Sequence, residues 1–190
     1  MSTLEKIKSL AESECIVDTL LKEVRANECQ ICGKCVFGYE GITQLEAILS
    51  DITEKRGRSE DLMLMTGLCH LMETQSLCET GEEIARAVLA ALGTHQSDFE
   101  EHIGKKGCRA GICQKFMTYH ILADKCTGCG DCLDQCDEDA IQGKPRFVHI
   151  ITQDECTQCG VCLRACDEEA IVKAGPIKPR CPKRPVPCKR

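Results

Sequence analysis

Cysteine is the residue type with which this chain could do chemistry. The 190 residues include 18 cysteines, and eight of these form two copies of one pattern, C-x2-C-x2-C-x3-C. The first copy consists of Cys126, Cys129, Cys132 and Cys136. The second copy, thirty residues later, consists of Cys156, Cys159, Cys162 and Cys166. Thiolates are soft ligands suited to iron–sulfur clusters and zinc, so the repeat predicts a pair of metal centres.

The spacing itself favours iron–sulfur clusters. It is the run that binds [4Fe–4S] clusters in bacterial-type ferredoxins, where the fourth cysteine of each run ligates the other cluster. The predicted ligand sets are therefore Cys126, Cys129, Cys132 and Cys166 for one cluster and Cys156, Cys159, Cys162 and Cys136 for the other. Zinc is the alternative, but zinc sites use paired C-x2-C knuckles rather than triples.

Acidic residues follow the fourth cysteine of each run. Proline is usual at this position, but here Asp137 and Asp167 open the acidic runs 137–139 and 167–169. Acids at the start of a short helix interact favourably with the helix dipole. Alternatively, negative charge beside a cluster disfavours the added electron and could attract a basic partner.

Helices and short strands must position these cysteines. Apolar residues at helical spacing predict helices over 3–26, 41–56, 59–74 and 81–92. We therefore expect an α+β chain, in which an N-terminal helical bundle with an iron–sulfur site precedes a two-cluster ferredoxin module of βαββαβ type. The expected boundaries are 1–103 for the helical domain, 104–116 for a linker with a metal site, 117–175 for the ferredoxin module and 176–190 for a basic, proline-rich tail. The composition of the tail predicts a flexible arm.

Charge and hydropathy exclude several classes of function. The net charge is −6, and because residues 176–190 carry six basic side chains and no acid, residues 1–175 carry −12. An acidic body argues against nucleic acid, whose phosphates need a basic surface. The sequence shows neither a secretory signal nor an apolar run of membrane-spanning length. These features predict a cytoplasmic protein in which cysteines bind metal rather than form disulfides.

A further C-x2-C-x2-C run lies in the helical half. It consists of Cys29, Cys32 and Cys35, and Cys78 lies in the segment Ser-Leu-Cys-Glu-Thr-Gly. Residues 28–102 resemble the iron–sulfur domain of the NADH-binding subunit of respiratory complex I. With residues 108–173 included, the chain is similar to the longer beta subunits of NAD-linked hydrogenases and formate dehydrogenases. The segments that carry the resemblance are Cys32-Gly-Lys-Cys35, Glu40-Gly41, Ser76-Leu-Cys78 and Phe99-Glu-Glu-His102-Ile.

The resemblance implies a third [4Fe–4S] cluster, with two departures from the family. The family pattern C-G-K-C-x-x-C places its third cysteine where this chain has Gly38, so Cys29 is expected to supply the missing ligand beside Cys32, Cys35 and Cys78. An empty or zinc-bound site is the alternative. The family's flavin- and dinucleotide-binding domain has no counterpart here, since no G-x-G-x-x-G or P-loop occurs. We therefore expect neither FMN nor NAD.

Several remaining cysteines and a histidine suggest a zinc site between the two halves. Cys108 and Cys113 follow His102, and Cys69 or His70 is expected as the fourth ligand. Buried free thiols and a helix-capping histidine are the alternative. Cys15, on the apolar side of the first predicted helix, is expected to be a core thiol. Cys181 and Cys188 in the tail receive no assignment.

These features together predict an electron-transfer subunit of an anaerobic, multi-subunit oxidoreductase, with three [4Fe–4S] clusters and a candidate zinc. Its expected partners are a catalytic subunit and a flavin- or NADH-binding subunit. A structural subunit that joins catalytic partners, with some clusters vestigial, is the main alternative. A free two-cluster carrier would leave the helical half without a role, and no nucleophile–base pair indicates an enzyme.

Overall fold

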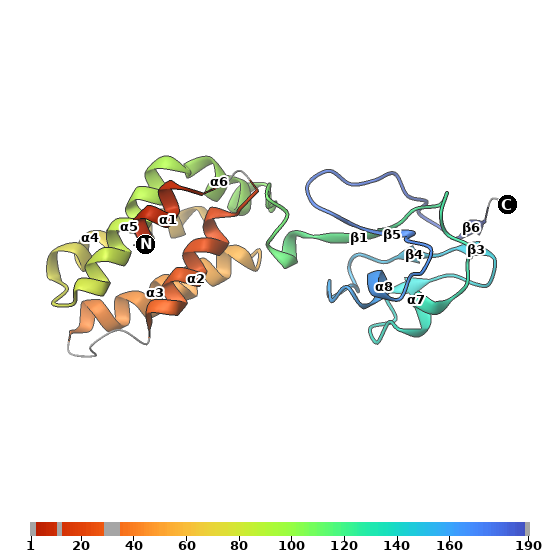
Figure 1. The fold of residues 1–190 in the computed structure, drawn as a ribbon, viewed down its shortest axis with the longest axis horizontal. Helices are drawn as coiled ribbons and strands as arrows, with labels where there is room; N and C mark the ends of the chain where they lie inside the picture. Colours follow the sequence, from red (N-terminus) through yellow and green to blue (C-terminus); the bar gives the residue numbers. More distant parts are fainter. Residues whose placement is uncertain (1–2, 11–12, 29–34, 189–190) are drawn as a thin grey trace. The chain divides into compact units, whose positions relative to one another are not determined.

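The computed structural model describes residues 3–10, 13–28 and 35–188, and the chain divides into two compact units, 1–116 and 117–190. The first unit is helical and the second contains short strands and two short helices (Figure 1). The expected α+β class is therefore confirmed at this level. No helix in these ranges is long and apolar enough to cross a lipid bilayer.

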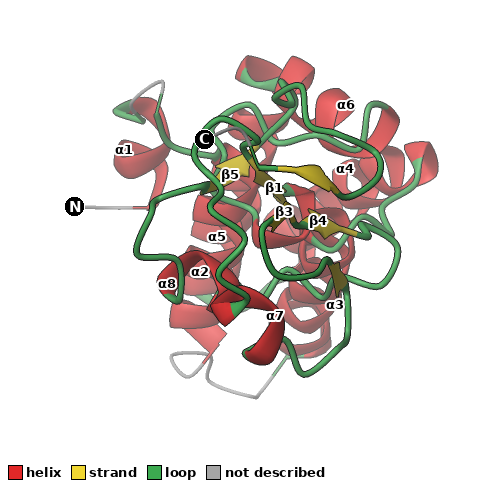
Figure 2. Ribbon diagram, turned by 90° about the vertical axis from the view of Figure 1, so that its right-hand side faces the viewer, coloured by secondary structure: helices red, strands yellow, loops and turns green. Residues whose placement is uncertain are grey.

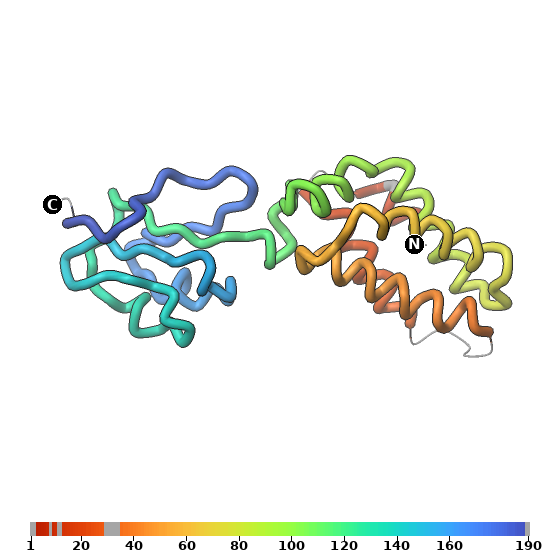
Figure 3. The backbone as a smooth tube through the Cα atoms, turned by 180° about the vertical axis from the view of Figure 1, so that it is seen from behind, coloured from red at the N-terminus to blue at the C-terminus, as the bar shows by residue number. Residues whose placement is uncertain are grey.

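The first unit contains six α-helices and one 3-10 turn among its described residues. They are α1 (Thr3–Lys8), α2 (Ile16–Glu28), α3 (Val36–Thr53), α4 (Ser59–Gln75), α5 (Glu79–Thr94), α6 (Gln96–Gly104) and η1 (Gln114–Phe116). Helices α2 and α3 lie side by side, as do α4 and α5 (Figure 3). Residues 104–116, which we expected to be a linker, belong to this unit.

The core of the helical unit follows the apolar spacing of the sequence. In α3 the buried side chains are Ile42, Leu45, Leu49 and Ile52, which recur every three or four residues along one face. The corresponding faces of α2 and α5 are buried as well. The single helix predicted over 3–26 is wrong, because α1 ends at Lys8 and α2 begins only at Ile16. This interruption leaves Cys15 in the loop before α2.

The second unit pairs its strands in three small antiparallel sheets. β1 (Thr118–Ile121) pairs with β5 (Ile171–Ala174), β2 (Ile141–Gln142) with β4 (Ile150–Ile151), and β3 (Phe147–Val148) with β6 (Val186–Pro187). Figure 2 shows β1 and β5 side by side. The short helices α7 (Asp131–Asp134) and α8 (Val161–Arg164) pack against each other. Each of these helices follows a cysteine loop.

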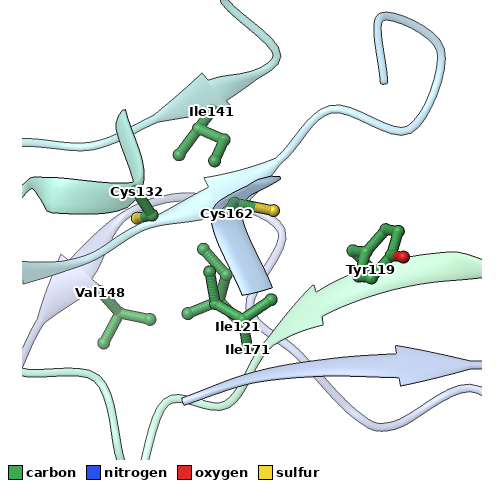
Figure 4. Packing of buried hydrophobic residues seen from close by; sticks show 7 residues of the cluster. All are labelled: Tyr119, Ile121, Cys132, Ile141, Val148, Cys162 and Ile171. Atoms are coloured by element: carbon green, nitrogen blue, oxygen red, sulfur yellow. The ribbon is translucent and has the colours of Figure 1, made fainter. Parts of the chain in front are cut away.

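A small apolar core lies between these elements (Figure 4). It contains Tyr119, Ile121, Cys132, Ile141, Val148, Cys162 and Ile171. The side chains of Cys132 and Cys162 belong to this core, but their sulfur atoms point in different directions (Figure 4). The core therefore separates two cysteine environments within one unit.

The tail is folded where its composition predicted a flexible arm. Val186 and Pro187 form β6 against β3, and the Cys188 amide donates a hydrogen bond to the Arg146 carbonyl at 3.0 Å. Cys188 also packs against the apolar core of the unit. Proline is tolerated on an edge strand because its missing N–H need not face the partner. The expectation of a flexible arm is therefore wrong for residues 186–188.

Candidate metal centres

Each predicted cysteine quartet of the second unit lines a cavity of its own. One cavity is lined by Cys126, Cys129, Cys132 and Cys166, and the other by Cys136, Cys156, Cys159 and Cys162. Each quartet thus combines three cysteines of one copy with the fourth cysteine of the other. Because α7 and α8 pack against each other, the cysteine that follows each helix lies beside the opposite loop.

Left-handed backbone conformations allow each loop to turn tightly around its cavity. Gly128 and Gly130 have φ of 72° and 106° in the first loop, and Gln158 and Gly160 have φ of 59° and 76° at the equivalent places in the second. Gly128 has a further reason to lack a side chain. A Cβ there would lie 2.7 Å from the Phe147 nitrogen, so the first loop packs directly on the backbone of β3.

The thiols of the two quartets are suited to a bound cation. Burial, followed by the charge of neighbouring thiolates, raises the pKa of Cys132 to about 12 and that of Cys162 to about 11. Thiolates crowded together repel one another in the absence of positive charge, whereas a metal deprotonates its thiol ligands outright. Four thiols around one cavity therefore fit the chemistry of an iron–sulfur cluster.

The helical unit brings two of its four predicted cluster ligands together. Cys35 precedes α3 and Cys78 precedes α5, while Cys29 and Cys32 lie outside the described residues. The Leu77 amide donates a hydrogen bond to the Cys35 sulfur at 3.4 Å, and the Ser76 hydroxyl lies 3.6 Å from the same sulfur. These two contacts lower the pKa of Cys35, as suits a thiolate ligand.

Gly38 lies between these two cysteines and has a packing role. A Cβ at position 38 would lie 2.8 Å from the Cys35 sulfur and 3.3 Å from the Cys78 Cβ. Gly81 is similarly constrained, because its Cβ would lie 2.8 Å from the Ser76 hydroxyl oxygen. The two glycines allow the starts of α3 and α5 to approach each other. The observed packing therefore requires glycine rather than cysteine at position 38.

Replacing Gly38 with alanine should push the Cys35 and Cys78 loops apart. We expect Gly38→Ala to lower the free energy of unfolding by about 1–3 kcal/mol, as overpacking does, and to reduce the iron bound per chain. Gly67→Ala is the matched control, since Gly67 is also helical and no atom lies within 4 Å of its added Cβ. Chemical denaturation and iron analysis of both variants provide the measurement. Unchanged stability and iron in Gly38→Ala would contradict this account.

A third group of metal-type ligands is buried in the helical unit. The ligand atoms of Cys15, His102, Cys108 and Cys113 all lie within 4.8 Å of one another. The His102 Nε2 atom is 3.3 Å from the Cys15 sulfur and 3.5 Å from the Cys113 sulfur, and these two sulfurs are 3.6 Å apart. All four residues are buried. Three sulfurs and one imidazole nitrogen are a common ligand set of structural zinc sites.

The surroundings of His102 prepare its ring for this role. The ring Nδ1 lies 2.7 Å from the Asp98 carbonyl oxygen, an acceptor that needs a proton on Nδ1. This leaves Nε2, which faces the cysteines, to supply a lone pair once it has lost its proton, as in metal sites where a carbonyl orients the histidine ligand. Phe116 packs edge-on against the ring, with centroids 5.1 Å apart.

Charge attraction within the group also indicates a cation-binding set. Burial alone would lower the pKa of His102, but hydrogen bonds with Cys108 and Cys15 outweigh it and raise the pKa to about 10. Hydrogen bonds from Cys113 and Cys15 lower the pKa of Cys108. The positive charge that stabilises the thiolates here is a proton, and a divalent metal would supply it with all three thiols ionised.

The fourth member of this group differs from our expectation. We expected Cys69 or His70 beside His102, Cys108 and Cys113, but the group contains Cys15. Cys69 is buried on α4, where burial raises its pKa to about 12, and His70 is exposed. Cys15 is buried, as expected of a core thiol, but its sulfur also belongs to this group of ligands. No spacing motif could reveal that Cys15 meets His102, because Cys15 precedes His102 by 87 residues.

The sequence matches two iron–sulfur families. Residues 18–102 match the family described as the NADH-ubiquinone oxidoreductase-F iron-sulfur binding region, and residues 125–170 match the 4Fe-4S dicluster domain. The chain is therefore an iron–sulfur protein in which the first of these regions is joined to the second. The expected resemblance to complex I and hydrogenase subunits is confirmed.

Three curated proteins are similar to this chain in sequence. The chain is 31% identical to the NADP-reducing hydrogenase subunit HndC of Solidesulfovibrio fructosivorans over 138 residues, which are 73% of this chain and 28% of that protein. It is 28% identical to the F subunit of an NADH-quinone oxidoreductase of Streptomyces coelicolor and 27% identical to the F 2 subunit of one from Rhizobium meliloti. Each of these two alignments covers 51% of this chain and under a quarter of the relative. The chain thus spans less than a third of the length of these relatives.

Proposed function

We propose that this protein is an electron-transfer subunit that relays single electrons through [4Fe–4S] clusters within a multi-subunit oxidoreductase. The observation that carries the proposal is the pair of cavities in the second unit, each lined by a complete set of four cysteines. The match to a dicluster family over residues 125–170 supports it. We further propose that this unit has the fold of a bacterial-type two-cluster ferredoxin.

The cavities support an assignment of residues to each cluster. Cys126, Cys129, Cys132 and Cys166 would hold one cluster, and Cys136, Cys156, Cys159 and Cys162 the other. A [4Fe–4S] cluster supplies one-electron chemistry, accepting and releasing an electron without forming a bond to a substrate. The chain holds the cysteine sulfurs, turns the loops through Gly128 and Gly160, and limits water through the apolar core. These features set the potential rather than perform a reaction.

A third cluster is proposed for the helical unit, with Cys29, Cys32, Cys35 and Cys78 as ligands. Support comes from the match of residues 18–102 to an iron–sulfur binding region and from the approach of Cys35 and Cys78 to Gly38. We propose a zinc ion for Cys15, His102, Cys108 and Cys113, which tie the start of α2 to the end of α6. A closed four-ligand site of this kind is structural.

The names of the relatives support a proposal about the partners. HndC and the two F-type relatives are named as parts of a hydrogenase and of NADH-quinone oxidoreductases. We propose that this chain works beside a catalytic subunit and a flavin- or NADH-binding subunit, binds neither FMN nor NAD and has no catalytic site of its own. Because its ligands are reduced thiols that oxidation would consume, we propose a reducing compartment, the cytoplasm, as its location.

Iron and sulfide analysis of anaerobically purified protein tests the proposal. Three clusters correspond to about twelve iron atoms per chain, and two to about eight. We expect about twelve in the full chain and about eight in Cys29→Ala, with Cys69→Ala as a matched control that keeps all twelve. Four or fewer iron atoms in the full chain would favour the structural-subunit alternative instead. Unchanged iron in Cys29→Ala would exclude that residue as a ligand.

A further inference from the structure

One buried ring occupies the same repeat position beside each cysteine loop. Shifting the sequence by thirty residues aligns Tyr119 with His149. His149 lines the cavity of Cys126, Cys129, Cys132 and Cys166. Tyr119 instead lies by the second loop, where its hydroxyl is 2.6 Å from the position of a Cβ on Gly160. Tyr119 is not among the residues that line the second cavity.

His149 is a buried polar group beside the first cavity. The residue is 2% exposed, and it lines this cavity together with Glu168 and the four cysteines. The ring packs on Gly143, where an added Cβ would overlap the imidazole. By contrast, the ring of His120 is half-buried and lies 2.9 Å from the Thr118 hydroxyl. A buried N–H is costly to leave without an acceptor, and the cavity that His149 lines would supply one when its cysteines hold a cluster.

The ring of His149 can act as a donor. An imidazole carries at least one N–H whether it is neutral or protonated. The sulfur atoms of a cluster are hydrogen-bond acceptors, and such bonds raise the reduction potential because they stabilise the added negative charge.

The acidic residues around the two cavities differ as well. Glu168 lines the first cavity, whereas Asp137 and Glu138 line the second. Negative charge disfavours an added electron, and the second cavity has one carboxylate more. The two differences therefore act in the same direction, and both make the first cluster easier to reduce.

We propose that the N–H of His149 hydrogen-bonds to a sulfur of the cluster held by Cys126, Cys129, Cys132 and Cys166, and that this cluster is the more easily reduced of the two in its unit. The inference rests on the proposed function, because it assumes that both clusters are present. By this contact His149 influences which of the two clusters holds a single electron. The electron enters the oxidised cluster without transfer of an atom.

Redox titration followed by electron paramagnetic resonance tests the inference. A Cys159→Ala background isolates the first cluster of the unit, and a Cys129→Ala background isolates the second. In the first background we expect His149→Leu to lower the equilibrium constant for reduction of the cluster about tenfold. This corresponds to a potential lower by about 59 mV for one electron. His149→Gln retains an N–H and should recover most of this loss. His149→Leu in the second background and His120→Leu in the first should cause no shift.

The outcomes separate the inference from the proposed function. Iron content too low for two clusters in this unit would overturn the proposed function itself. Full iron content with no shift in His149→Leu, or with a shift only in the second background, would overturn the inference alone. Because His149→Leu could fail to fold, a second measurement uses the unsubstituted chain with ¹⁵N-labelled histidine. We expect a nitrogen hyperfine coupling to the reduced first cluster, which disappears in Cys129→Ala, and its absence would overturn the inference.

Discussion

Replacing Cys132 and Cys166 together with alanine should remove no more iron than replacing either one alone. Both residues line one cavity although they belong to different copies of the repeat, so each substitution disables the same cluster. We expect every one of these three variants to lose about four iron atoms of the full complement. The measurement is iron per chain after anaerobic purification.

The matched control pairs two cysteines of one copy. Cys132 and Cys136 are four residues apart, but they line different cavities. The double variant Cys132→Ala/Cys136→Ala should therefore lose both clusters of the unit, about eight iron atoms. If this pair lost one cluster and the Cys132/Cys166 pair lost two, the fourth cysteine would serve its own loop, and the ligand sets would be wrong.

Replacing His102 with alanine should remove the zinc ion proposed for its site and destabilise the helical unit. A structural zinc site contributes folding free energy outright. Each kcal/mol lost lowers the melting temperature of a domain of this size by about 4–8 °C. With roughly 3 kcal/mol lost, we expect a decrease of about 12–24 °C, and a similar decrease after zinc is removed from the unsubstituted protein with a chelator.

The control for this experiment is the cysteine that sequence reasoning had placed in the site. Cys69→Ala should keep one zinc per chain, because Cys69 lies outside the ligand group, and should cost only the small loss of buried volume, roughly 1 kcal/mol. Cys15→Ala should lose zinc as His102→Ala does. Zinc retained in Cys15→Ala but lost in Cys69→Ala would show that the group formed by the structure is not the metal site.

Local patterns in the sequence were informative where structure depends on neighbouring residues. The apolar periods over 41–56, 59–74 and 81–92 correspond to α3, α4 and α5 within a few residues, because each helix buries one continuous face. The same periodicity concealed the break between α1 and α2. Ile7, Leu10 and Val17 stay close to helical spacing across the break, so the pattern alone could not show that the helix ends.

Contacts between distant residues were beyond sequence reasoning. Cys15 joins His102 across 87 residues, and no local spacing encodes such a meeting. The pairing of β6 with β3 was hidden for a different reason, because proline and basic residues are typical of flexible segments. His149 belongs to none of the motifs described above, and only the cavity that it lines gives it a role.

The pairing of β6 with β3 has a consequence for the order of assembly in the cell. Gly128 in the first cysteine loop packs on the backbone of Phe147, and Phe147 is paired with Pro187 near the end of the described chain. During synthesis, the first loop leaves the ribosome before β6, the strand that pairs with β3, on which the loop packs. Delivery of iron and sulfur to a fully braced first loop would therefore require that residues 186–187 have already been synthesised.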